Sequence, residues 1–62
     1  MQNLLTTNEA AKLLRLSPNT IRAWRFQGRL PVVKLGSRIL FRTEDLEKLI
    51  SANIIPAKET RH

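Results

Sequence analysis

The sequence predicts a small, mostly α-helical domain that carries one β-hairpin. Apolar residues recur at helical spacing in three segments, and between the second and the third the pattern changes to alternation in VVKLGSRILF. Hydrophobic residues make up 42% of the 62 residues, which is enough for one compact core and too much for a disordered chain. We therefore expect a single domain over residues 1–53, in the order helix, tight turn, helix, hairpin, helix.

The first helix is predicted over residues 8–14. Thr7 has a side chain suited to a helix N-cap, and Glu9 falls in the first turn, where the helix dipole favours an anion. Four apolar residues at helical spacing form the face that we expect in the core: Ala10, Ala11, Leu13 and Leu14.

The second helix is predicted over residues 18–27, after a short turn at Arg15-Leu16. Ser17 is expected to cap this helix, and Pro18 would occupy the first helical position, where a missing N–H costs nothing. Gly28 supplies the signal for the end of the helix.

The second helix has one face for the core and one for solvent. Ile21 and Trp24 lie together on a helical wheel, so we expect the Trp24 ring in the core, where it anchors the helix. Arg25 falls between the two faces, and its stem is expected to cover Trp24 while its head reaches a phosphate or a carboxylate of the third helix. Phe26 falls on the outer face, where DNA sugars, the hairpin and a neighbouring protomer are its alternative contacts.

The hairpin admits two registers. Its apolar residues are Val33, Leu35, Ile39 and Phe41. They share one face only if Leu35 lies opposite Ile39, because directly opposed residues point the same way. We predict that register, which makes Gly36-Ser37-Arg38 the loop and places a cation at the tip. The alternative is a two-residue loop, Gly36-Ser37, which pairs Leu35 with Arg38 and divides the apolar residues between two faces.

The third helix is predicted over residues 44–51, with Thr43 as its cap. Acidic residues crowd its first turns, and an apolar stripe of Leu46, Leu49 and Ile50 faces inward. The periodicity stops at Asn53. Residues 54–62 are expected to form a mobile C-terminal tail, with Ile54 and Ile55 packed back on the domain.

The net charge of +6 is unevenly distributed along the chain. All five acids lie outside residues 10–43, and eight cations lie inside that interval: Lys12, Arg15, Arg22, Arg25, Arg29, Lys34, Arg38 and Arg42. This segregation leaves an uncancelled positive field over the middle of the molecule. A nucleic acid is the partner that such a field favours, with a merely solvated basic face, an acidic protein or a membrane surface as the alternatives.

Two helices joined by a short turn, the second carrying arginines, form a helix-turn-helix, in which the second helix enters the DNA major groove. The run TTNEAAKLLRLSPNTIRAWRFQGRLPVVKLGSRILFRTEDLEKLI resembles excisionase-type DNA-binding domains. Within it, TIRAWRFQGRLP and FRTEDLEKL look like the DNA-binding domain of mercury-resistance-type (MerR) regulators. The resemblance covers residues 5–50 and implies a winged helix-turn-helix whose hairpin, the wing, lies against the DNA backbone or the minor groove.

The resemblance also implies a function. Excisionase-type proteins bend DNA and steer an integrase toward excision, and close relatives regulate transcription of mobile elements. We therefore expect a cytoplasmic, nucleoid-associated protein that binds double-stranded DNA sequence-specifically, as a recombination directionality factor or a transcriptional regulator. An integrase or recombinase and further copies of the chain, side by side on DNA, are the other expected partners. The MerR-type regulators continue into a dimerisation helix and an effector-binding region, whereas this chain ends at His62, so no small-molecule effector is expected.

On the second helix, five polar residues are predicted to contact DNA. Asn19 suits an adenine edge, with a hydrogen bond to its own backbone as the alternative. Arg22 matches an arginine of the regulators and suits a guanine edge or a phosphate. Ser17 and Thr20 could each donate to a phosphate, although plain capping explains Ser17 equally well. Arg25 would add a phosphate contact.

On the hairpin, Lys34 and Arg38 are predicted to contact the DNA backbone or the minor groove, with Ser37 assisting at the tip. The alternative is that these cations only protect a strand edge from aggregation. Arg29 and Arg42 flank the hairpin and are weaker candidates for phosphate contacts.

Other classes of function fit the sequence less well. His62 is the single histidine, there is no cysteine, and no phosphate-binding glycine loop or metal-spaced ligand set occurs, so we expect no enzyme, cofactor or metal. No apolar run or leader segment predicts a membrane partner. The remaining rival is a protein-interaction adaptor that uses the same fold to bind an acidic surface of a recombinase or a polymerase.

Overall fold

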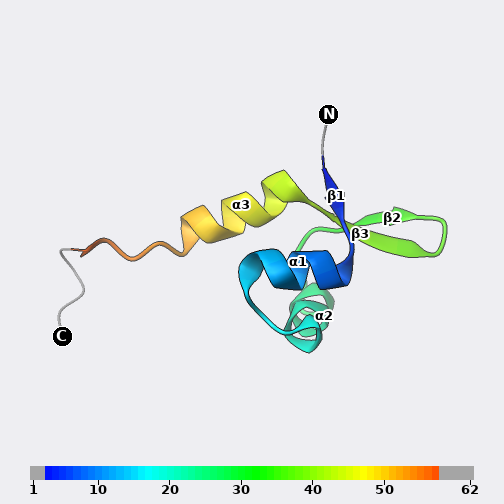
Figure 1. Cartoon of the computed structure of the whole chain (residues 1–62), viewed down its shortest axis with the longest axis horizontal. Coiled ribbons are helices and arrows are strands. Elements are labelled where there is room, and N and C mark those ends of the chain that lie inside the picture. The colour runs from blue at the N-terminus through cyan, green and yellow to red at the C-terminus, as the bar shows by residue number, and fades with distance from the viewer. Residues whose placement is uncertain (1–2, 58–62) are drawn as a thin grey trace.

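The computed structural model describes residues 3–57 of the chain. The elements follow in the order β1 (Leu4–Leu5), α1 (Thr7–Leu14), α2 (Pro18–Phe26), β2 (Val33–Leu35), β3 (Arg38–Arg42) and α3 (Thr43–Ala52) (Figure 1). Three helices and a small antiparallel sheet confirm the predicted mostly α-helical class. With the hairpin following the helix pair, they form a winged helix-turn-helix.

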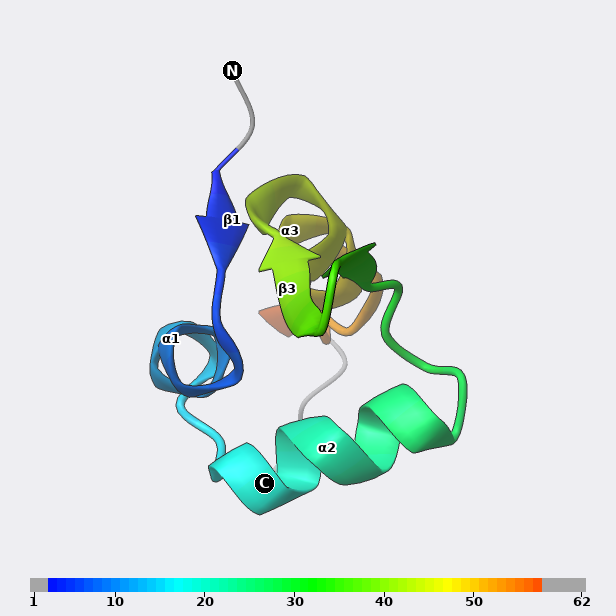
Figure 2. The same ribbon diagram turned by 90° about the vertical axis from the view of Figure 1, so that its right-hand side faces the viewer.

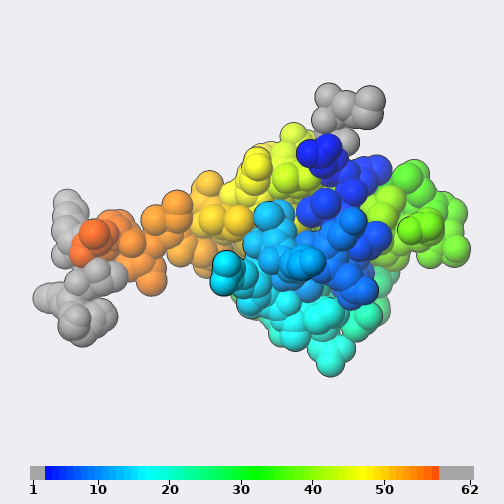
Figure 3. Space-filling view, viewed as in Figure 1, coloured from blue at the N-terminus to red at the C-terminus, as the bar shows by residue number. Residues whose placement is uncertain are grey.

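The elements are arranged around the sheet. The β2–β3 hairpin projects at one end of the molecule, and α3 runs toward the other end (Figure 1). In the perpendicular view α1 is seen end-on while α2 lies across it, so the two helices cross at a steep angle (Figure 2). The space-filling view shows the hairpin and the segment after α3 as extensions on opposite sides of the body (Figure 3). Among residues 3–57, no helix is long and apolar enough to cross a membrane.

Strand β1 was not predicted. It pairs antiparallel with β3, Leu4 opposite Arg42 and Leu5 opposite Phe41, and gives the sheet the strand order β1-β3-β2. Two residues are too few to display an alternating pattern, and their pairing partner lies far along the chain. This strand therefore depends on tertiary contacts that no local pattern indicates.

The caps of two helices differ from the prediction. The cap of α1 is Thr6 and not Thr7: the Thr6 Oγ1 accepts from the Glu9 N–H at 3.2 Å, and the Glu9 Oε1 accepts from the Thr6 N–H at 2.9 Å. Only Thr6 stands three residues before Glu9, the spacing that a capping box requires. Thr43 does not cap α3 but lies inside it, and its hydroxyl donates to the Asn3 carbonyl oxygen at 3.0 Å.

The predicted hairpin register is wrong. Leu35 lies opposite Arg38 and Lys34 opposite Ile39, so the loop is the two-residue Gly36-Ser37. Gly36 has a φ of +61°, and glycine at the first central position is the requirement of a type II′ turn. Turn geometry therefore decides the register. The hairpin extends past the core, and Leu35 is 53% exposed. Placing all apolar residues of the hairpin on one face would therefore bury little apolar surface.

One core holds the elements together. Six residues are buried: Ala10, Ala11, Ile21, Leu30, Phe41 and Leu46. Trp24 is partly buried and packs against them, as predicted. Leu13 and Ile50 were predicted to face inward but are 48% and 45% exposed. Ile54 and Ile55 are 67% and 69% exposed, so they do not pack back on the domain. The mobility predicted for residues 54–62 stays a prediction, and residues 58–62 lie outside the described part.

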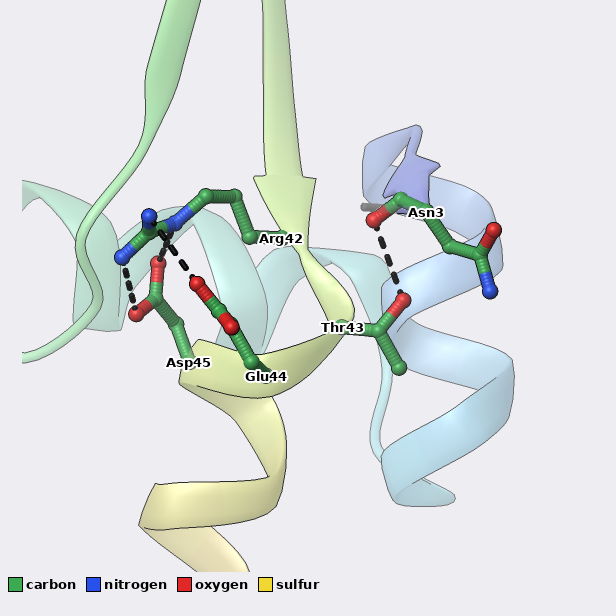
Figure 4. Close-up of polar contacts among 5 residues, drawn as sticks. All are labelled: Asn3, Arg42, Thr43, Glu44 and Asp45. Atoms are coloured by element: carbon green, nitrogen blue, oxygen red, sulfur yellow. Dashed lines mark hydrogen bonds and ion pairs between the residues drawn. The ribbon is translucent and has the colours of Figure 1, made fainter. Parts of the chain in front are cut away.

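The junction of β3 and α3 is tied by polar contacts (Figure 4). The Arg42 guanidinium donates from Nε and Nη2 to the two carboxylate oxygens of Asp45, both at 2.7 Å, and its Nη1 lies 3.1 Å from Glu44 Oε2. Asp45 is only 8% exposed. The hydrogen bonds from Arg42, followed by the positive charges of Arg42 and Lys48, hold the pKa of Asp45 below its ordinary value, despite the opposing effect of desolvation. On the other side of the junction, the Thr43 N–H donates to the Asn3 carbonyl oxygen at 3.0 Å.

The capping box generates the first prediction. Thr6→Ala removes a side-chain acceptor at the start of α1 and should lower the free energy of unfolding by ~1 kcal/mol. Thr7→Ala is the matched control, since Thr7 lies inside the helix, and it should change stability by a few tenths of a kcal/mol. Urea unfolding followed by circular dichroism measures both. A larger loss in the Thr7 variant would contradict the assigned cap.

The Arg42–Asp45 pair predicts a pH dependence of stability. The folded-state pKa of Asp45 lies below its unfolded value, so the carboxylate stabilises the fold above about pH 4. This stabilisation is lost as the pH falls through about 4 and then through the folded-state pKa. Asp45→Asn should therefore give a shallower decline of the unfolding free energy between about pH 6 and 3 than the wild type shows.

Glu47→Gln is the control for that experiment, because it removes a carboxylate from the exposed side of the same helix. It should keep the pH slope of the wild type. Urea unfolding at a series of pH values measures all three proteins, and parallel curves for wild type and Asp45→Asn would contradict the assignment.

Candidate nucleic-acid interface

The turn between α1 and α2 orients the second helix. Arg15 ends α1 in the left-handed conformation, with a φ of 58°, and the Leu16 N–H donates to the Ala11 carbonyl oxygen at 2.9 Å. Leu16 then packs against the core. The chain thus turns from α1 into α2 within three residues, with the partly buried Leu16 holding the turn against the core.

The start of α2 follows the sequence prediction. Ser17 Oγ accepts from the Thr20 N–H at 3.1 Å and lies 2.9 Å from Thr20 Oγ1, and Pro18 is the first helical residue. Capping by Ser17 is therefore confirmed. Ser17 is exposed at this helix end, with Thr20 half-buried beside it.

The end of α2 is a glycine stop. Gly28 has a φ of +77°, and its N–H donates to the Arg25 carbonyl oxygen at 3.0 Å. The Arg29 N–H donates to the Trp24 carbonyl oxygen at 2.8 Å. These two bonds form a Schellman motif, which ends the helix where the sequence predicts and turns the chain toward the buried Leu30.

The solvent side of α2 carries four exposed residues, which we call the outer stripe: Asn19, Arg22, Ala23 and Phe26. Ile21 is buried on the opposite side. Arg22 Nη1 donates to Asn19 Oδ1 at 3.0 Å, so the two predicted base contacts lie next to each other. This side-chain pair takes the place of the backbone hydrogen bond that was the alternative for Asn19.

Two arginines at the end of α2 lie over aromatic rings. The Arg25 guanidinium carbon is 4.7 Å from the centre of the Phe26 ring, and that of Arg29 is 4.3 Å from the centre of the Trp24 ring. The guanidinium over Trp24 is therefore that of Arg29, which reaches back from beyond the glycine stop, whereas the head of Arg25 lies over Phe26. In both arrangements the aromatic ring restricts the conformations of the guanidinium group and keeps its positive charge beside α2.

The hairpin presents its three predicted residues at the surface. Lys34, Ser37 and Arg38 are exposed, and within residues 3–57 neither Lys34 nor Arg38 has a salt-bridge partner. The two-residue loop places Arg38 beside the tip, at the first position of β3. Lys34, Ser37 and Arg38 therefore all lie toward the projecting end of the hairpin, separate from the α2 residues on the body (Figure 1). Lys34 pairs with Ile39 and Arg38 with Leu35, so the two cations lie on opposite faces of the hairpin.

Arg42 does not join this surface. Its position beside the hairpin made it a candidate for a phosphate contact. Its guanidinium is instead engaged by Asp45 and Glu44 at the base of α3. The spacing of three residues between Arg42 and Asp45 is compatible with such an ion pair. The two side chains come into contact because β3 passes directly into α3 between them.

Comparison with known proteins agrees with this architecture. The model of a family described as "Helix-turn-helix domain" matches residues 4–54, which is most of the chain. No curated protein and no solved structure matches the chain with significance. The matched segment contains all six elements, from β1 to the end of α3. The chain therefore belongs to the helix-turn-helix domain family of DNA-binding domains.

Proposed function

We propose that this protein binds double-stranded DNA sequence-specifically, with α2 in the major groove and the β2–β3 hairpin against the backbone or the minor groove. The observation that carries the proposal is the outer stripe of α2, where Asn19 and Arg22 are exposed on a helix that contains no acidic residue. In a helix-turn-helix, this is the side that faces the base edges.

The α2 residues divide into two roles. Asn19 and Arg22 contact base edges, since an amide suits adenine and a guanidinium suits guanine. Their mutual hydrogen bond in the free protein holds both side chains toward the same side, so each is partly oriented before binding. Phosphates are contacted from two places on α2. Ser17 and Thr20 do so at the helix start, and Arg25 does so at the edge of the outer stripe.

The hairpin supplies sequence-independent affinity. Lys34 and Arg38 contact the backbone or line the minor groove, and Ser37 donates to a phosphate at the tip. Because these residues lie on an element that projects from the body, they extend the contacted DNA beyond the segment under α2. A module of this size buries about 600–1,000 Å² on DNA, so two or more copies bound side by side would provide the specificity.

The biological role that we propose follows the excisionase-type resemblance. The protein acts in the cytoplasm, on the nucleoid, as an architectural recombination directionality factor or as a transcriptional regulator of a mobile element. The MerR-type resemblance of TIRAWRFQGRLP supports the same use of α2. An integrase or recombinase is the protein partner in the first role.

Selection from a random duplex pool at about 150 mM salt tests this proposal. Direct repeats spaced by about one helical turn, ~10 bp, would support side-by-side copies, whereas inverted repeats would indicate a two-fold dimer typical of a repressor. An adaptor for an acidic protein surface is the rival function, because a basic face attracts carboxylates as well as phosphates. Absence of any duplex binding at about 50 mM salt would favour the adaptor.

Two substitutions separate specific from general contacts. Arg22→Ala should weaken binding to the selected site by ~1–3 kcal/mol and relax the base preference at one position. Lys34→Ala should weaken binding to all duplexes alike and reduce the slope of log K against log salt by about one unit. Fluorescence anisotropy with selected and scrambled duplexes measures both effects.

Lys48→Ala is the matched control, because it removes an exposed cation from α3, away from both proposed contact surfaces. It should leave base preference unchanged. An Arg22→Ala variant that retains the full preference of the wild type would show that α2 is not the helix that contacts the bases.

A further inference from the structure

Phe26 is the most exposed large apolar side chain in the described part of the chain, at 75%. It lies on the last turn of α2, on the side opposite the core, so the fold itself makes no use of its apolar surface. The ring is therefore available to a partner surface at the end of a candidate DNA-contacting helix.

The position of Phe26 on α2 indicates which surface it meets. The members of the outer stripe stand at positions i, i+3, i+4 and i+7, from Asn19 to Phe26. Side chains at these intervals share one side of a helix, and DNA-contacting helices reach successive bases with this same spacing. Ala23, between Arg22 and Phe26, is too small to block close approach along the stripe.

The charges around Phe26 indicate what kind of surface its ring contacts. Arg25 stacks over its ring at 4.7 Å, Arg22 lies one turn away, and α2 contains no acidic residue. An apolar group surrounded by cations suits a partner that is strongly anionic yet offers an apolar contact. The DNA major groove meets both conditions, because its walls are phosphates and the C5-methyl of thymine is the apolar group on its floor.

We propose that Phe26 contacts the C5-methyl group of a thymine in the major groove and makes thymine the preferred base at that position. Arg25 covers one face of the ring, so the other face and the edge are available to the methyl group. Phe26 lies ~6 Å along the helix from Arg22 and ~10 Å from Asn19. With base pairs ~3.4 Å apart, the thymine should lie about two base pairs from the base that Arg22 contacts.

This inference rests on the proposed DNA binding, and the test separates the two. In a duplex obtained by selection, each thymine is replaced in turn by deoxyuridine, which removes only the methyl group. Wild-type protein should bind about three- to fivefold more weakly when one particular thymine is replaced, as expected for the loss of a single methyl contact. Binding is measured by fluorescence anisotropy at about 150 mM salt, where the sequence-independent phosphate contacts contribute less affinity than at low salt.

Variants assign the effect to Phe26. Phe26→Ala should bind the thymine and the uracil duplex equally, and Phe26→Leu, which keeps an apolar side chain, should retain a reduced preference for thymine. Ile54→Ala is the matched control: Ile54 is 67% exposed but lies beyond α3, so this variant should keep the full ratio. Because Phe26 is outside the core, circular dichroism should show all variants folded.

Three results would overturn the inference while leaving the DNA-binding proposal in place. The first is that no replacement of thymine by uracil weakens binding. The second is that Phe26→Ala keeps the full preference for thymine. The third is that the selected sites have no constant thymine near the position at which Arg22→Ala loses its base preference. The second result, with recombinase recruitment lost in Phe26→Ala, would assign the ring to a protein contact instead. Failure of the wild type to enrich any duplex would contradict the DNA-binding proposal itself.

Discussion

The burial of Phe41 on β3 is the constraint on which the rest of the structure depends. β3 is the central strand of the sheet, and it contacts both α1 and α3 as well as its two neighbouring strands. Phe41 is the largest of the fully buried side chains, and the alanines of α1 allow that helix to approach it closely. A chain of 62 residues has room for one core of this kind, so the placement of α1 and α3 on β3 follows from packing around one ring.

Several features that depend on neighbouring residues were predicted, whereas the strand that depends on a distant partner was missed. The start of α2 at Pro18, its cap at Ser17 and its end at Gly28 are local signals, and the structure has all three. Strand β1 was missed because its partner is β3, which lies far along the chain, with Leu4 opposite Arg42. In the hairpin, the apolar pattern and the Gly36 turn made conflicting predictions, and the turn determined the register because the hairpin tip has no core to face.

For the candidate site, residue types and helix faces could be predicted, but the partners of individual arginines could not. The wheel correctly places Asn19, Arg22 and Phe26 together on the outer side of α2. It cannot show that Arg42 is held by two carboxylates, or that Arg29 reaches back over Trp24. Such pairs form across helix ends and strand junctions, where spacing along the chain does not determine distance. The net charge therefore overstates how many cations are available to a partner.

The direct passage from β3 into α3 has a mechanical consequence. No loop residue separates the two elements, and the joint is braced on one side by Arg42 with Asp45 and on the other by Asn3 with Thr43. The hairpin and α3 extend to opposite ends of the molecule from this joint (Figure 1). Any change in the angle between the hairpin and α3 would therefore have to break the contacts of Arg42 with Asp45 or of Thr43 with Asn3.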